Sequence, residues 1–135
     1  MTSRERHYDL LWLPGRYAVC RLPPHSLLTA MPGGPFLTIT RTPDELSVVC
    51  LEDEAPAGAR REGPYALFRV AGAMDLDLTG VLAAIVQPLA AAAVSILAVG
   101  TFDTDYVLVR DADRARAQAT LAAAGHRFVE PSPEP

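Results

Sequence analysis

The second half of the chain shows the clearest hydrophobic pattern. Between residues 79 and 93, apolar side chains recur at the spacing of one helix face, at Val81, Leu82, Ile85, Leu89 and Ala92. Short apolar runs at 65–70, 95–100 and 106–109 predict strands. A second helix is predicted after residue 111, ending just before a glycine at 125, and a closing strand follows at 126–129.

This order of elements is strand, helix, strand, strand, helix, strand, which is typical of an α+β, ferredoxin-like βαββαβ fold with helices on one face of an antiparallel sheet. The first half repeats the order in shortened form. Strands are predicted at 8–13, 17–22, 36–40 and 46–51, with a brief helix at 25–31 and an exposed connection at 52–63. We therefore expect a truncated N-terminal module over residues 1–63, a complete module over 64–130 and a disordered tail over 131–135.

Two predicted strands are apolar at successive positions, Ile96 to Val99 and Val107 to Val109. A sheet covered by helices on one face usually alternates apolar and polar residues, because its other face meets water. The pattern therefore predicts that the second face, or the sheet edge, is covered by the other module, by a second chain, or by both. A homodimer is the simplest such assembly.

The composition of the chain excludes several classes of function. The chain has 135 residues, a net charge of −4 and no basic run, which argues against nucleic-acid binding. It contains no lysine, so a Schiff-base lysine and a P-loop lysine are both excluded. Cys20 and Cys50 lie in apolar runs and are expected in the core. The polar N-terminus does not resemble a signal peptide, and the apolar stretch at 81–99 is interrupted by polar residues and proline, so we expect a cytoplasmic protein with no membrane segment.

The candidate chemistry lies at two turns. Gly80 follows Asp77, Leu78 and Thr79 at the start of the first predicted helix, where free backbone N–H groups attract a carboxylate. The alternative is a glycine required only by a tight turn, with Asp77 or Thr79 as a helix cap.

Asp103 and Asp105 lie at the turn between the two apolar strands. Asp103 is expected to be a turn residue, whereas Asp105 opens a strand and could pair with an ammonium or guanidinium group. The aspartate pair could also indicate acid–base chemistry or a divalent cation, but no third ligand or nucleophile is evident nearby. The three histidines are isolated, so we predict no metal site, no cofactor and no enzyme.

The run from Asp77 to Ala83, the segment Val94-Ser95-Ile96 and the run from Thr101 to Val109 together resemble an ACT domain. The resemblance is closest to small bacterial ACT-domain proteins akin to the ACT modules of aspartokinase and of the cytosolic arginine sensors. The segment from Phe36 to Val49 resembles the first module of those bacterial proteins.

The resemblance implies regulatory binding of an amino acid at an interface between ACT modules. It implies ligand contacts from the helix-start turn and from the following strand, and a hairpin carboxylate. The implied ligand-binding residues are Asp77, Leu78, Thr79, Gly80, Val81, Val94, Ser95, Ile96 and Asp105.

Two positions depart from the usual ACT pattern. Thr79 stands where a proline commonly precedes the turn glycine, and Ala93 stands where a glycine usually precedes the second strand. These departures keep open an alternative function, a dimerisation or interaction module that docks on a partner enzyme and whose ligand pocket is vestigial.

Overall fold

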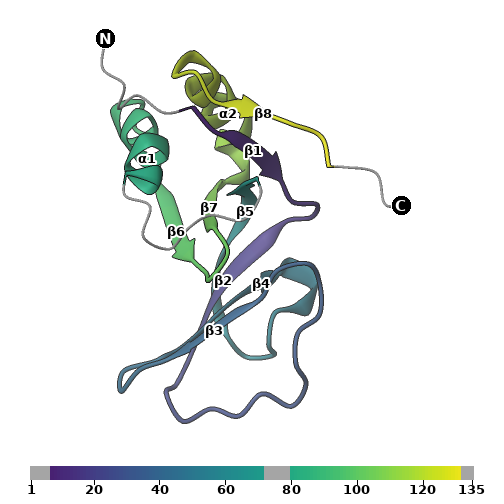
Figure 1. Cartoon of the computed structure of the whole chain (residues 1–135). Coiled ribbons are helices and arrows are strands. Elements are labelled where there is room, and N and C mark those ends of the chain that lie inside the picture. The colour runs from purple at the N-terminus through teal and green to yellow at the C-terminus, as the bar shows by residue number, and fades with distance from the viewer. Residues whose placement is uncertain (1–6, 72–79, 132–135) are drawn as a thin grey trace. The chain divides into compact units, whose positions relative to one another are not determined.

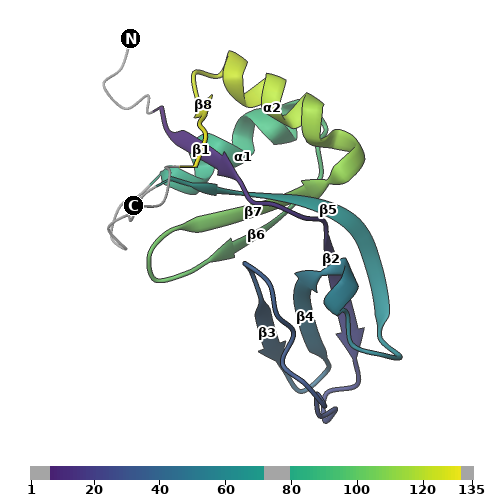
Figure 2. The same ribbon diagram turned by 90° about the vertical axis from the view of Figure 1, so that its right-hand side faces the viewer.

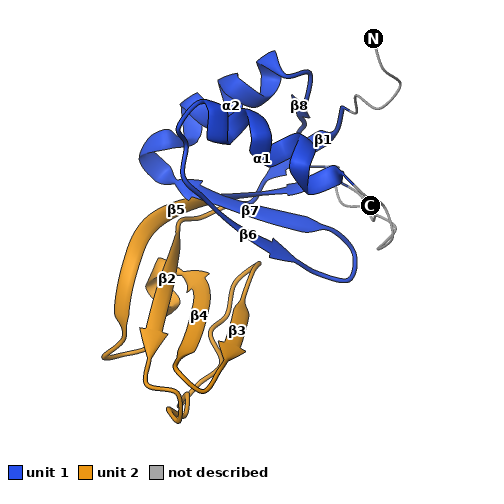
Figure 3. Cartoon of the chain, turned by 90° about the vertical axis from the view of Figure 1, so that its left-hand side faces the viewer, with its two compact units in different colours: residues 1–13, 67–135 blue, residues 14–66 orange. Residues whose placement is uncertain are grey.

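The computed structural model describes residues 7–71 and 80–131 of the chain. The chain divides into two compact units, which Figure 3 colours separately. Unit 1 comprises residues 1–13 and 67–135, and unit 2 comprises residues 14–66. The first strand therefore folds with the second half of the chain, while the intervening segment forms a unit of its own.

The described residues contain eight strands, two α-helices and two short 3-10 helices, joined by turns and loops. Figure 1 labels the strands and α-helices. In chain order they are β1 (Asp9–Trp12), β2 (Tyr17–Leu22), β3 (Thr38–Arg41), β4 (Leu46–Leu51), η1 (Glu52–Glu54), β5 (Arg60–Val70), α1 (Val81–Ala91), β6 (Ile96–Gly100), β7 (Asp105–Arg110), η2 (Asp111–Asp113), α2 (Arg114–Ala123) and β8 (Arg127–Phe128).

The second half of the chain has the predicted βαββαβ order. In unit 1, β7 pairs with β5 and β6, and the end of β5 pairs with β1 in antiparallel fashion, with Leu10 opposite Val70. The short β8 lies parallel to β1. Figure 2 shows both helices on one face of this sheet. The predicted α+β fold is therefore confirmed.

The core of unit 1 lies between the helices and the sheet. Ile85 and Leu89 of α1 and Leu121 of α2 are fully buried, at the helical spacing that the sequence predicts. Aromatic side chains fix α2 to the sheet. Trp12 stacks on Phe128 at a centroid distance of 4.9 Å and donates an Nε1–H hydrogen bond of 2.8 Å to the Gln118 side chain.

The two helices end in the same way. At the end of α1, the N–H of Val94 bonds to the carbonyl of Leu89, and at the end of α2 the N–H of His126 bonds to that of Leu121. Both turns are Schellman motifs, which need a residue with positive φ. That residue is Gly125 after α2 but Ala93 after α1, and Ala93, with a φ of 61°, is the sole non-glycine residue with positive φ in the described chain.

Unit 2 is a strand-rich structure. Its strands follow the order β3-β4-β2-β5, and all the neighbours are antiparallel. One face of the sheet carries the core residues Ala18, Cys20, Val48 and Cys50, packed against residues of the surrounding loops. Both cysteines are free and buried, and burial is the main cause that raises the pKa of the Cys50 thiol to about 11.

Two parts of unit 2 differ from the sequence prediction. Residues 25–31 form no helix. Prolines flank the segment, and the Arg41 guanidinium donates hydrogen bonds to the carbonyl of Ser26 and to that of Pro24 just before the segment. Strand β5 begins at Arg60 and not at Tyr65, because its polar first residues pair with β2. The predicted exposed connection is therefore shorter than expected.

Within 7–71 and 80–131, neither α-helix is long and apolar enough to cross a membrane.

Candidate functional site

Gly80 lies immediately before α1, as predicted. It has a φ of 83°, is exposed, and no atom of the described residues lies within 4 Å of a Cβ placed on it. Its carbonyl accepts the N–H of Ala84, and no described side chain caps the helix start. A helix start without a side-chain cap has free N–H groups that can receive a carboxylate. The predicted ligand residues Asp77, Leu78 and Thr79 lie outside the described residues.

The β6–β7 turn is held by two threonines. The Thr101 hydroxyl donates to the carbonyl of Thr104 at 2.9 Å, and it accepts the N–H of Thr104 at 3.3 Å. The buried Thr104 hydroxyl donates to the carbonyl of Val70, the last residue of β5, at 2.9 Å. These bonds anchor the turn next to the end of β5. Asp103 lies within this turn, as predicted, and the two threonines make the hydrogen bonds described here.

Asp105 is the first residue of β7 and pairs with Gly100, the last residue of β6. Its carboxylate leans over that glycine, because Oδ1 lies 3.5 Å from a Cβ placed on Gly100. The side chain is half-buried and has no hydrogen bond or ion pair among the described residues. Within 7–71 and 80–131, the Asp105 carboxylate is therefore left without a partner near the end of the hairpin.

The predicted site residues divide between two ends of unit 1. Figures 2 and 3 show α1 and β6 running in opposite directions, with the β6–β7 turn at the end where α1 begins. Gly80 and Asp105 therefore lie towards the same end. Val94, Ser95 and Ile96 lie at the opposite end, because they connect α1 to β6. Ile96 and Gly100 are four residues apart on the strand, which corresponds to about 13 Å.

Burial distinguishes the predicted ligand residues that pack in the core from those that a ligand could reach. Val81 and Val94 are almost completely buried, at 4% exposure each, and belong to the core. Ser95 is exposed and Ile96 is half-buried, so both can be reached from outside the unit. Of the predicted residues that the structure describes, Gly80, Ser95, Ile96 and Asp105 therefore have atoms available to a ligand.

Strand β6 has a feature that the site prediction did not include. Leu97 is 38% exposed, and Ala98 and Gly100 are also exposed, although the strand has no charged residue. Phe102, in the turn that follows, is 80% exposed. The described strands pair with only one edge of β6. The signal in the sequence was the uncharged run itself, which predicted a covering partner but not which part of the sheet it would cover.

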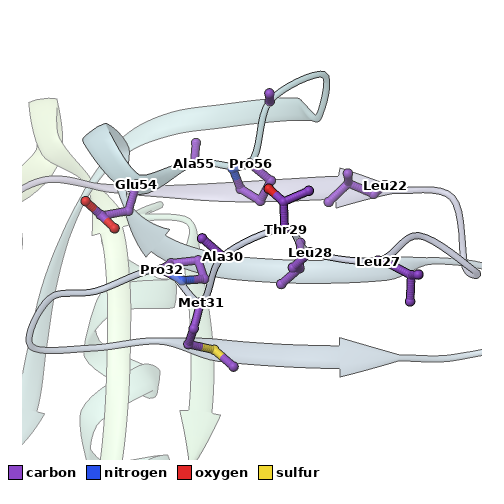
Figure 4. Close-up of a pocket in the computed structure, with 11 residues that line it drawn as sticks. Leu22, Leu27, Leu28, Thr29, Ala30, Met31, Pro32, Glu54, Ala55 and Pro56 are labelled. Carbon is purple, nitrogen blue, oxygen red and sulfur yellow. The ribbon is translucent and has the colours of Figure 1, made fainter.

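A separate hollow lies among the loops of unit 2, and Figure 4 shows its lining. Its volume is about 290 Å³, and it lies between the segment 27–32 and the residues that follow η1. The Glu54 carboxylate accepts the N–H of Gly33 at 2.7 Å, which ties these two segments together. This hollow contains none of the predicted ligand residues. Within the ranges that the structure describes, no group of acidic, histidine or cysteine side chains could hold a metal ion.

The family comparisons agree with the fold. A family model described as an ACT domain matches residues 60–123. A second model, described as an N-terminal domain, matches residues 15–58. No protein of curated function matches the chain.

Three solved structures share this architecture. Protein Atu0741 from Agrobacterium tumefaciens is 35% identical, with a TM-score of 0.86, and the match covers 96% of this chain and 98% of that one. VC0802 from Vibrio cholerae is 20% identical, with a TM-score of 0.70 and coverage of 86% and 88%. Aspartate kinase from Clostridium acetobutylicum is 15% identical, with a TM-score of 0.59, and the match covers 81% of this chain but 32% of the kinase.

The likeness to the kinase is therefore confined to a part of that enzyme and concerns the fold alone. The match to Atu0741 extends over nearly the full length of both proteins. Together with the two family models, it shows that this chain belongs to the ACT-domain proteins, with an ACT domain preceded by a distinct N-terminal domain.

Proposed function

We propose that the protein is a non-catalytic, cytoplasmic regulatory protein that binds a free amino acid at an interface between the ACT modules of two chains. Gly80 and the first N–H groups of α1 would receive the ligand carboxylate. Asp105 would receive its ammonium group or a cationic side chain. The single observation that carries the proposal is that the uncapped helix start and the Asp105 carboxylate, neither of which has a side-chain partner among the described residues, lie towards one end of unit 1.

A second chain would explain why the predicted residues are divided. If two β6 edges pair in antiparallel fashion about a two-fold axis, the start of one strand lies next to the end of the other. Ser95 and Ile96 of one chain would then lie next to Gly80 and Asp105 of the second chain. The exposed, uncharged edge of β6 supports this arrangement. In this proposal the module of residues 64–130 binds the ligand, and the region 1–63 is an accessory module.

The direct test is a thermal-shift screen of the proteinogenic amino acids. A ligand that binds only the folded state raises its stability by RT ln(1 + [L]/Kd), which is about 2.7 kcal/mol at one hundred times Kd. We expect at least one amino acid to raise the melting temperature at millimolar concentration, and Asp105→Asn to abolish that shift while the protein stays folded.

Asp103→Asn is the matched control, because it removes an exposed carboxylate from the same hairpin. That variant should keep the shift. If no amino acid shifts the wild-type melting temperature while the protein still dimerises through β6, the interaction-module alternative is favoured. The uncharged β6 edge is the observation that supports that alternative, and a partner enzyme would then be sought by co-purification.

A further inference from the structure

The face of the unit 2 sheet opposite its core carries an open hollow of about 420 Å³. It lies wholly within residues 14–66, on strands β2, β4 and β5 and the turn before β4. Half-buried Val19 forms part of its floor. The residues that line it are Val19, Cys20, Arg21, Glu45, Ser47, Arg60, Arg61 and Glu62.

Strand register places three polar side chains in one row across this hollow. Arg21 on β2 is directly opposite Ser47 on β4 and directly opposite Arg60 on β5. Residues directly opposite one another in antiparallel strands point to the same face, and their Cβ atoms lie about 4.5–5.5 Å apart. Two guanidinium groups and one hydroxyl therefore arise side by side from three adjacent strands.

The two arginines are poorly neutralised. Arg21 donates from Nη2 to the carbonyl of Asp44 at 2.9 Å, and its Nε lies 3.9 Å from Oε1 of Glu45, in an exposed and therefore weak ion pair. The Arg60 guanidinium makes no hydrogen bond or ion pair with the described residues. Like charges directly opposite each other destabilise a sheet. An anion between the two guanidinium groups would remove this repulsion and gain charge-assisted hydrogen bonds.

We propose that this hollow binds a small oxyanion, a carboxylate or a phosphate, between the guanidinium groups of Arg21 and Arg60, with the Ser47 hydroxyl as a further donor. Glu45 and Glu62 also line the hollow, whereas Arg61 is directly opposite the core residue Cys20, so its side chain points to the other face of the sheet. Two guanidinium groups and two carboxylates therefore belong to the hollow, and this balance disfavours a polyanion relative to a ligand with a single negative charge. This site is separate from the proposed amino-acid site and does not depend on it.

Isothermal titration calorimetry in a low-salt, zwitterionic buffer tests the proposal, with inorganic phosphate and acetate as separate probes. We expect saturable binding of at least one probe. Arg60→Gln should weaken that binding about tenfold or more, because it removes a charge-assisted pair of donors. Ser47→Ala should weaken it less. The two probes should compete with each other if both bind. The probe with the lower Kd shows whether the hollow prefers a carboxylate or a phosphate.

Arg41→Gln is the charge-matched control, because it removes an exposed arginine of unit 2 that does not line the hollow. It should leave probe binding unchanged, as should Asp105→Asn in the proposed amino-acid site. Circular dichroism establishes that each variant is folded. The absence of saturation with either probe up to tens of millimolar, or an equal loss in Arg60→Gln and Arg41→Gln, would overturn the proposal.

Discussion

His126 lies where three segments of unit 1 meet. Its Nδ1 accepts the N–H of Tyr8 at 3.1 Å, so the ring hydrogen is on Nε2, which faces the carbonyl of Ala84 at 3.0 Å. The ring also stacks on Tyr8 at a centroid distance of 5.8 Å. One neutral imidazole therefore connects the start of β1, the helix α1 and the turn after α2. Sequence analysis placed His126 at the start of the closing strand and treated it as isolated, whereas these distant partners are visible only in the fold.

Protonation of His126 should weaken this connection. Burial is the main cause that lowers the pKa of His126 below its ordinary value of 6.5. The unfolded chain therefore takes up the proton first, and the free energy of unfolding falls as the pH drops below about 6.5 until the folded imidazole is protonated too. Urea unfolding between pH 8 and 5 measures this effect.

His126→Gln should flatten that pH dependence and lower the stability at pH 8. His25→Gln, which removes an exposed imidazole from unit 2, serves as the control and should retain the wild-type dependence. An unchanged slope in His126→Gln would contradict the prediction.

Ala93 is the second residue whose environment leads to a prediction. It occupies the left-handed position of the Schellman turn after α1, with a φ of 61°. This conformation costs an L-residue about 1–2 kcal/mol, whereas glycine adopts it freely but loses more entropy on folding. Ala93→Gly should therefore raise the free energy of unfolding by about 0.5–1 kcal/mol, measured by urea denaturation.

Gly125 provides the reverse comparison, because it holds the same position after α2. Gly125→Ala should destabilise the protein by about 1 kcal/mol, and its Cβ would also press on the His7 ring. Destabilisation by both substitutions would show that the helix-end conformation does not control stability at residue 93.

At the scale of elements, β6 stands out because apolar residues of this strand are exposed and the described strands pair with only one of its edges. Its partner β7 has three consecutive residues fully buried, Val107, Leu108 and Val109, whereas β6 exposes Leu97 and Ala98. An exposed and uncharged edge strand readily pairs with another chain. This is the element through which we expect two copies to associate.

If two copies associate through β6 as proposed, Leu97→Lys should give a folded monomer, because a lysine on an edge strand opposes pairing. Light scattering measures the mass, and the thermal-shift screen should lose its response in the same variant. Ile39→Lys is a closely matched control, since Ile39 lies on the edge strand β3 of unit 2 and is 39% exposed, against 38% for Leu97. Equal effects of the two substitutions would argue against a specific β6 interface.

At the scale of the whole molecule, the spacing of apolar residues predicted helices and strands correctly where those residues are the ones buried in the fold. Strands β2 and β4 have the predicted bounds, and the apolar face of α1 packs as expected. The helix predicted at 25–31 was wrong, because proline and an arginine from a distant strand determine that segment. The pattern also could not show that the first strand pairs with residues 68–70 and 127–128, since such pairing depends on contacts remote in sequence.

The site could be predicted only in part for the same reason. The Gly80 turn and Asp105 follow from local sequence, and their placement towards one end of unit 1 follows from the βαβ order. The same order places the predicted residues 94–96 at the other end of α1, and the structure agrees with this division. The arginine row in unit 2 depends on strand register, which the sequence pattern did not specify.

Both units contain a natural probe of unfolding. The sole tryptophan, Trp12, lies in unit 1, and both cysteines lie buried in unit 2. Because β5 supplies residues to both units, we expect them to unfold together. Tryptophan fluorescence and thiol labelling should therefore give the same urea midpoint. Labelling of the cysteines at a lower urea concentration would show that unit 2 opens independently.

The pairing of β1 also constrains the order of events during synthesis. Residues 14–66 form a unit from consecutive chain, so their mutual contacts can begin to form before the rest of the chain is made. Strand β1 leaves the ribosome earlier, but its partner β8 is made only after α2. The nascent chain must therefore carry Trp12 without its stacking partner Phe128 until β8 emerges. A chain truncated before residue 127 would be a natural substrate for chaperones or proteases.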